Sequence, residues 1–219
     1  MGLFQKIGQA VEFVESYPEK SKHAIREALD ALEFPHLLTL KLVPRQKRHG
    51  EKTVNVFNEH GALILSATGG GRWNERTASA ESVDGTVSFH MRSYPDGDNV
   101  RTRYSFQGTA GKHQLDYDLC NMNLSRAMKN LRTPFRVVMV FEPLGWDMYF
   151  DRKDISLMVQ KYTVADGNKK IMTLLRASAP AGEKYSSCVY VSYGSYGHLI
   201  PGMLLGLTLI GLVDDCGGA

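Results

Sequence analysis

The spacing of apolar residues divides the chain into three regions. In residues 1–34 apolar side chains recur every three or four positions, which is typical of amphipathic helices. From residue 37 onward the dominant spacing is two, which indicates β-strands with one face buried. Residues 199–213 then form an apolar run without a charged residue. The pattern therefore predicts a small helical segment, a large β region and one strongly apolar C-terminal helix.

The first region is predicted to be a pair of helices. The second helix begins near Ser16, with Pro18 and Glu19 in its first turn, and Pro35 ends it. The apolar stripe of the first helix consists of Leu3, Phe4, Ile7, Val11 and Val14. The stripe of the second helix consists of Ala24, Ile25, Ala28, Leu29 and Leu32. Residues 1–35 are therefore expected to form an N-terminal helical hairpin, separate from residues 36–219.

The second region reads as about twelve short strands joined by glycine-containing turns. The expected strands are residues 37–42, 52–57, 62–67, 77–82, 86–91, 100–106, 112–118, 135–141, 146–150, 155–162, 169–175 and 187–192. The expected hairpin turns are residues 58–61, 83–85, 107–111, 142–145 and 164–168, while residues 68–71 are predicted to be a tight turn and residues 121–131 a short helix. So many short strands at regular spacing favour a closed antiparallel barrel or a sandwich.

The C-terminal run favours the barrel over the sandwich. A helix that is apolar on all sides must be buried, and the interior of a large barrel is a place that can surround it. Fifteen residues are short for a membrane-spanning helix, which needs about 20. Gly202, Gly206 and Gly211 are expected where the helix backbone approaches the barrel wall closely. The fold class is therefore mainly β with α, an antiparallel barrel of about twelve strands around a helix at about residues 198–213.

The rhythm of these elements resembles a known family. Hairpins carrying NVFNEHGALI and SAESVDGTVSF, a late strand YSSCVYVS and an apolar helix ending LIGLVDD are similar to the tubby-like fold of the LURP-one-related proteins and phospholipid scramblases. The resemblance covers about residues 37–215, and its clearest part is residues 187–192, residues 199–213 and Asp214. It implies a twelve-stranded barrel and a role in binding phospholipids or phosphoinositides, with no catalytic signature. The proline-rich N-terminus and the cysteine cluster of scramblases are absent from this sequence.

Composition and cysteine usage narrow the function classes. Hydrophobic residues make up 43% of the chain and charged residues 22%, which is enough to bury a core. The net charge of +3 is too small for a dedicated nucleic-acid binder, so nucleic acid is not an expected partner. Three widely spaced cysteines exclude a disulfide scaffold and fit a reducing compartment. No secretory signal is recognised at the N-terminus, so we expect an intracellular protein, either peripheral to a membrane or within a large complex.

No pattern of catalytic residues stands out. The seven histidines have no metal-ligand spacing, and His90 is expected to be a hydrogen-bonded residue within a strand. Residues 194–197 resemble a nucleophile elbow but lack the glycine two positions before Ser195, so we expect a connection between strand and helix. Residues 68–71 are rich in glycine but lack the lysine and the helix of a phosphate-binding loop. The sequence thus predicts a protein that is not an enzyme and that needs no cofactor or metal.

One short segment of the chain is unusually rich in basic residues. Five bases lie within residues 41–52, namely Lys41, Arg45, Lys47, Arg48 and Lys52. A base near an anionic membrane gains about 1 kcal/mol, so this cluster is a candidate site for a lipid headgroup or another anion, although charge runs are often only solvated surface.

The N-terminal segment offers a second kind of contact surface. Its polar faces are mixed in charge with an excess of acid, which argues against insertion into an anionic membrane. The candidate docking residues are Leu3, Phe4, Ile7, Val11, Phe13 and Val14. The pair of helices is expected to dock on another protein chain or on the barrel wall. Two functions remain open: an accessory or scaffold subunit that binds other chains of a larger assembly, and a binder of anionic phospholipid headgroups.

Overall fold

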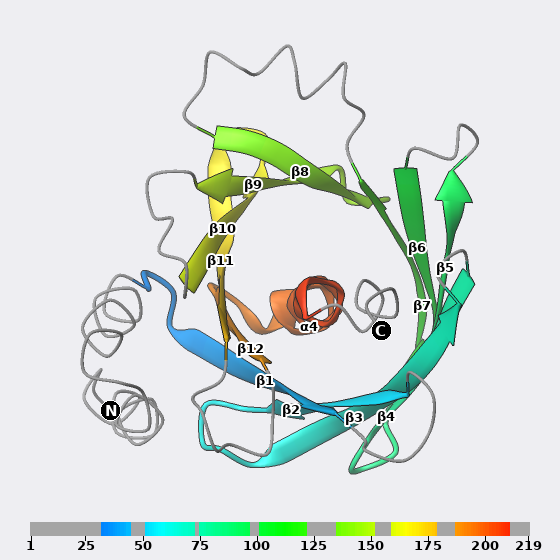
Figure 1. Ribbon diagram of the computed structural model, residues 1–219. Helices are drawn as coiled ribbons and strands as arrows, with labels where there is room; N and C mark the ends of the chain where they lie inside the picture. The colour runs from blue at the N-terminus through cyan, green and yellow to red at the C-terminus, as the bar shows by residue number, and fades with distance from the viewer. Residues whose placement is uncertain are drawn as a thin grey trace.

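The protein is a closed barrel of antiparallel strands in the computed structural model (Figure 1). The structure describes residues 32–44, 51–72, 75–96, 101–121, 135–151, 159–178 and 187–210. Each strand pairs with the strand that precedes it in the chain, and the last strand closes the barrel by pairing with the first. The prediction of a mainly β fold with a closed barrel of about twelve antiparallel strands is therefore confirmed.

The described residues contain twelve strands, one 3₁₀ turn and one α-helix. The strands are β1 (His36–Pro44), β2 (Lys52–Phe57), β3 (Leu63–Arg72), β4 (Glu75–Ser82), β5 (Val87–Asp96), β6 (Arg101–Ala110), β7 (His113–Asn121), β8 (Phe135–Glu142), β9 (Trp146–Asp151), β10 (Val159–Asp166), β11 (Lys169–Ser178) and β12 (Ser187–Tyr193). The 3₁₀ turn η1 (Tyr196–His198) leads directly into the helix α4 (Leu199–Leu209).

Alternation along the strands directs one set of side chains into the barrel. In β1 the inward residues Leu38, Leu40 and Leu42 are buried. In β4 every second residue is buried and the residues between are exposed. These inward side chains form one core cluster with the helix, so the interior is filled by packed side chains.

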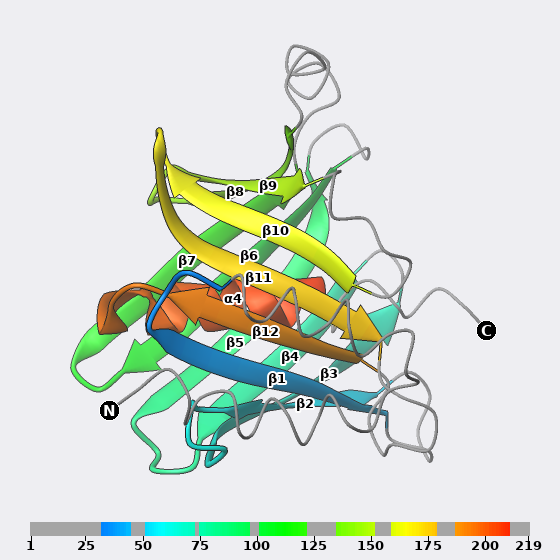
Figure 2. The ribbon, with the colours of Figure 1, turned by 90° about the vertical axis from the view of Figure 1, so that its left-hand side faces the viewer.

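The helix α4 lies inside the barrel, as the sequence predicts (Figures 1 and 2). All its residues from Pro201 onward are buried. Gly206 shows why glycine is needed, because a Cβ atom there would lie 2.8 Å from Leu40 Cδ2 and 3.1 Å from Val191 Cγ2. A Cβ atom at Gly202 would lie 3.0 Å from Val191 Cγ1. The expected close approach of the helix backbone to the barrel wall is confirmed at both positions.

Two of the expected hairpin turns are three residues shorter in the structure. The β6–β7 connection consists of Gly111 and Lys112, so the expected turn at residues 107–111 is wrong for its first four residues. The β10–β11 connection is Gly167 and Asn168, and residues 164–166 belong to β10. In both turns the glycine has a positive φ, which places the reversal there, whereas Gly108 lies within a strand.

The expected tight turn at residues 68–71 is also wrong. These residues continue β3 and pair with β4. A Cβ atom at Gly69 would lie 2.5 Å from Ala78 Cβ and 2.6 Å from the Thr77 carbonyl oxygen. The glycines therefore allow two strands to approach closely, and a glycine-rich sequence was mistaken for a turn.

Several predictions concern residues outside the described ranges. They are residues 1–31 of the expected helical hairpin, the short helix after Asn121, the continuation of α4 through residues 211–213 and the close approach at Gly211. These stay predictions. Residues 32–35 are described and form no helix, so the expected extension of the second helix to Pro35 is wrong, because the residue before a proline is disfavoured in the helical region.

Replacing Gly108 by alanine is expected to destabilise the barrel strongly. The new Cβ would lie 2.5 Å from Phe89 Cα on the paired strand, so the backbone of β5 or β6 would have to move. We expect the free energy of unfolding to fall by about 2 kcal/mol or more, measured by denaturant titration. Thr109→Val, at the exposed neighbouring position, is the control, with an expected change below about 0.5 kcal/mol.

Candidate functional site

The structure does not bring the two described bases of the basic cluster to one face. Lys41 is on the outward face of β1, opposite Asn55, and its Nζ lies 5.2 Å from the centre of the Phe57 ring. Lys52 begins β2, where alternation places it on the same face as the inward residue Val54. Arg45, Lys47 and Arg48 lie outside the described residues. Lys41 is therefore engaged in a cation–π contact within the sheet.

The candidate docking residues of the N-terminal segment are not described either. Leu3, Phe4, Ile7, Val11, Phe13 and Val14 all precede residue 32. The structure does describe residues 32–35, which connect this segment to β1.

A second apolar cluster lies on the outward face of the barrel, across β10, β11 and β12. This outer cluster consists of Val159, Leu175, Ala177, Cys188 and Tyr190. Its members alternate with inward residues, since Leu174, Val189 and Val191 belong to the core inside the barrel. The protein therefore has two apolar cores, one on each side of this part of the sheet.

Strand register makes the outer cluster continuous. Ala177 of β11 pairs with Val159 of β10 on one side and with Cys188 of β12 on the other. Leu175 of β11 pairs with Tyr190 of β12. Figure 2 looks onto this side of the barrel, which we call the outer wall: the outward face of β10, β11, β12 and β1. Leu37 and Val43 of β1 pack against the cluster at its edge.

The outward faces of other strands carry polar pairs instead. The Ser66 hydroxyl donates to Asn55 Oδ1 at 2.9 Å, between β3 and β2. Arg103 lies 2.9 Å from Asp118 and 3.1 Å from Glu142, joining β6, β7 and β8. His90 and Ser79 are 3.0 Å apart between β5 and β4, which confirms the prediction for His90. The outer wall thus differs in chemistry from the surfaces that these pairs occupy.

Cys188 shows how far the outer wall is removed from water. Its side chain is fully buried, and burial raises the pKa of the thiol to about 12, against smaller opposing effects of Tyr190 and Lys41. A thiol with such a pKa is protonated and unreactive at neutral pH. Among the described residues, Cys120 and Cys188 are both free cysteines.

Residues 33 and 34 are fastened to the outer wall by three contacts. Lys170 Nζ lies 2.9 Å from Glu33 Oε1 and 6.0 Å from the centre of the Phe34 ring. The hydroxyl of Ser192, on the outward face of β12, donates to the Phe34 carbonyl oxygen at 3.3 Å. A Cβ atom at Gly194 would lie 3.3 Å from Phe34 Cδ1. The chain therefore reaches β1 by crossing β11 and β12.

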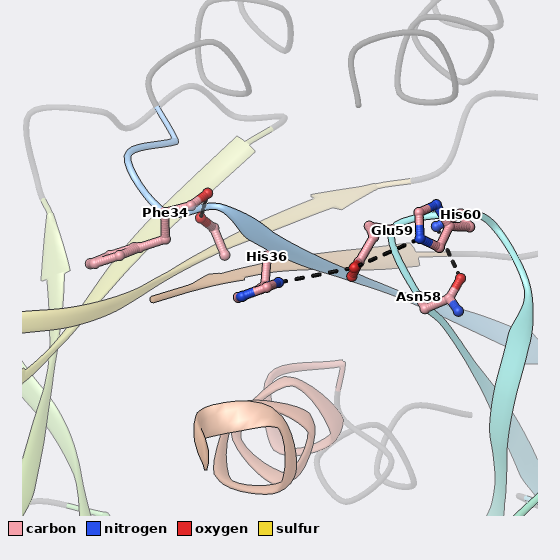
Figure 3. A network of polar contacts seen from close by, with 6 residues as sticks. Phe34, His36, Asn58, Glu59 and His60 are labelled. Atoms are coloured by element: carbon pink, nitrogen blue, oxygen red, sulfur yellow. Dashed lines mark hydrogen bonds and ion pairs between the residues drawn. The ribbon is translucent and has the colours of Figure 1, made fainter. Parts of the chain in front are cut away.

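A cluster of aromatic and titratable side chains lies at the adjoining end of the barrel (Figure 3). His36 Nδ1 and His60 Nε2 each lie 4.0 Å from Glu59 Oε1. The His36 ring lies 4.2 Å from the ring of Tyr196 and 5.3 Å from that of Tyr193. Burial, with smaller effects of Glu59 and Tyr196, raises the pKa of Tyr193 to about 12.

The chemistry of this end cluster is limited by its geometry. A separation of 4.0 Å is too long for a hydrogen bond between imidazole and carboxylate. Within the described ranges, no group of three or more His, Cys, Asp or Glu side chains could hold a metal ion. Burial, with a smaller effect of Lys169, lowers the pKa of His198, which packs edge-on against Trp146. The expected connection at residues 194–197 is confirmed as the bend and 3₁₀ turn between β12 and α4.

The outer cluster was missed at the level of sequence, although a signal was present. Residues 171–175 and 188–191 are apolar at consecutive positions, interrupted only by Thr173. Continuous apolar runs in strands indicate burial on both faces. The regular alternation elsewhere led to the assumption that every strand has a solvated outer face.

Comparisons with known proteins found no matching family model, no matching curated protein and no matching solved structure. In the part of the chain that the structure describes, no helix combines the length and the hydropathy that a membrane span requires.

Proposed function

We propose that the protein is a non-catalytic interaction module, an accessory or scaffold subunit that binds other protein chains of a larger assembly. The observation that carries this proposal is that Glu33 and Phe34 are held on the outer wall, directly after the N-terminal segment that contains the proposed docking stripe. A barrel packed around its own helix needs no second core, yet β11 and β12 are apolar on both faces. A sheet built in this way has a further layer of polypeptide against it.

The stripe of Leu3, Phe4, Ile7, Val11 and Val14, with Phe13 beside it, is the proposed partner-docking element. Glu33 and Phe34, which follow this segment, are held at the outer wall, and this supports a docking element on that side of the barrel. Amphipathic helices bind partner proteins by laying an apolar face into a groove.

We also infer a tubby-like barrel, related to the LURP-one-related proteins and phospholipid scramblases, preceded by a helical hairpin within residues 1–31. Twelve antiparallel strands in chain order around a C-terminal helix support this assignment. The order of elements agrees with the fold that the sequence resembles. No enzymatic activity is proposed.

The second candidate function is binding of an anionic phospholipid or phosphoinositide headgroup at the β1–β2 connection. It is favoured by the concentration of Lys41, Arg45, Lys47, Arg48 and Lys52 in and around this connection. We rank this lipid-binding function second because Lys41 and Lys52 are on opposite faces of the sheet and because Lys41 contacts Phe57. The free thiols of Cys120 and Cys188 support a reducing compartment inside the cell, within a complex or at a membrane surface.

The scaffold proposal is tested by purifying the tagged chain under native conditions from the cells that produce it naturally, and measuring the mass of the intact complex by mass spectrometry. We expect a stoichiometric assembly that an Ile7→Asp/Val11→Asp variant fails to form while remaining folded. A wild-type chain that is recovered alone, with lipid enriched, would favour the second function instead.

The lipid alternative has its own test. Changing Arg45, Lys47 and Arg48 to glutamate should leave stability within about 0.5 kcal/mol, because exposed substitutions seldom cost more. If the cluster binds headgroups, sedimentation with acidic-lipid vesicles should be abolished, and wild-type binding should weaken steeply with salt. Equal sedimentation of variant and wild type would remove this function.

A further inference from the structure

The outer wall is buried although it faces away from the barrel interior. Leu175, Cys188 and Tyr190 are at most 3% exposed, and Thr173 and Ser192 on the same face are 1% exposed. Leu37 and Val43 belong to β1 and therefore flank the outer cluster within the sheet. Among the described residues that pack against the cluster, only Leu32 comes from outside the sheet. One leucine does not cover side chains on three strands, so more of the chain must lie there.

The path of the chain identifies the segment that provides this cover. Glu33 is held by Lys170 at 2.9 Å, and Phe34 is held by Ser192 and Lys170. The residues immediately before Leu32 therefore start on the outer wall. Thirty-one residues precede this point, which is ample length to cover a patch three strands wide.

We infer that residues 16–31 dock on the outer wall of their own barrel as an amphipathic helix, with Ile25 and Leu29 continuing the contact that Leu32 begins. In a helix, residues three and four apart share a face, so Ile25 and Leu29 point to the same side, and Leu32 follows directly after the proposed helix. A helix over residues 25–31 spans about 9 Å, and three adjacent strands span about 10 Å. The apolar stripe thus matches the outer cluster in size.

This inference goes beyond the proposed function because it concerns the isolated chain. It assigns the two apolar stripes of the N-terminal segment to different surfaces. The stripe of Ile25, Leu29 and Leu32 binds the barrel in cis, and the stripe that begins at Leu3 is left for a partner chain. The stripe that begins at Leu3 can therefore fail to bind a partner chain while the stripe of Ile25, Leu29 and Leu32 still covers the outer wall.

The reactivity of the Cys188 thiol shows whether the outer wall is covered. In a Cys120→Ser/Cys216→Ser background it is the only thiol, and its rate of reaction with a disulfide reagent at about pH 8 measures exposure of the outer wall. We expect Ile25→Asp/Leu29→Asp to raise this rate at least about tenfold, because the thiol then regains access and a lower pKa. The control His23→Asp adds an aspartate to the helix face opposite the stripe and should change the rate less than about twofold. A stripe variant that reacts as slowly as the parent would overturn the inference.

A second measurement keeps the inference testable if the stripe variant unfolds. With p-benzoylphenylalanine in place of Leu29, irradiation of the dilute full-length protein should give intramolecular cross-links to peptides of β11 or β12. The same probe at His23 should give few such products. Cross-links confined to β2–β6, or found only between molecules, would show that the segment does not cover its own outer wall.

Discussion

Replacing Leu205 by aspartate is expected to prevent the chain from folding into its barrel. Leu205 is completely buried in α4, which lies within the barrel and belongs to the same core cluster as the inward residues of the strands. An unpaired carboxylate at this position costs several kcal/mol, a large part of a typical stability of about 5–15 kcal/mol. We expect loss of the cooperative thermal transition by circular dichroism and recovery of the protein in the insoluble fraction.

The control for this variant is Leu144→Asp. Leu144 lies in the β8–β9 turn and is 38% exposed, so the same change of side chain should alter stability by less than about 1 kcal/mol. A Leu205→Asp chain that stays soluble, monomeric and cooperatively folded would show that α4 does not pack inside the barrel.

The barrel could be predicted from sequence because two independent patterns agree. Period-two alternation marks strands with a buried face, and an apolar helix without a polar side requires an interior to enclose it. Gly206 is an example of this agreement. A glycine within the apolar run predicts close approach of the helix to the barrel wall, and at Gly206 the helix lies against Leu40 and Val191. Strand ends were harder to predict, because Gly69 and Gly108 are required by neighbouring strands, and pairing between strands leaves no local signal.

The apolar runs of β11 and β12 indicate burial on both faces, but the contacts that bury the outer wall could not be deduced in the same way. Burial of Cys188 and Tyr190 depends on which strands are neighbours, and on the return of residues 32–34 across β11 and β12. Those contacts join positions more than 130 residues apart, so local periodicity does not record them. The basic cluster is a different case: its charges are close in sequence, but strand alternation separates Lys41 from Lys52, and its other three bases lie outside the described residues.

Deleting residues 1–31 is expected to leave a folded barrel that associates with itself. The interior core is formed by the strands and α4, so the sheet signal in circular dichroism should remain. The outer cluster would lose its cover and become a contiguous exposed apolar patch, which promotes association. Light scattering after size exclusion should report dimers or larger species at concentrations where the full chain is monomeric, with increased binding of an apolar dye.

A rescue experiment connects this association to the outer wall. In the shortened chain, Leu175→Lys/Tyr190→Thr makes outward positions of β11 and β12 polar, as outward positions of a solvated sheet normally are. We expect the monomer to return and dye binding to fall. The same two substitutions in the full-length chain should instead weaken the cover and lower the free energy of unfolding, because they place polar groups beneath it. A shortened chain that stays monomeric without the rescue would mean that the outer wall tolerates water, and the apolar residues on β11 and β12 would then need another explanation.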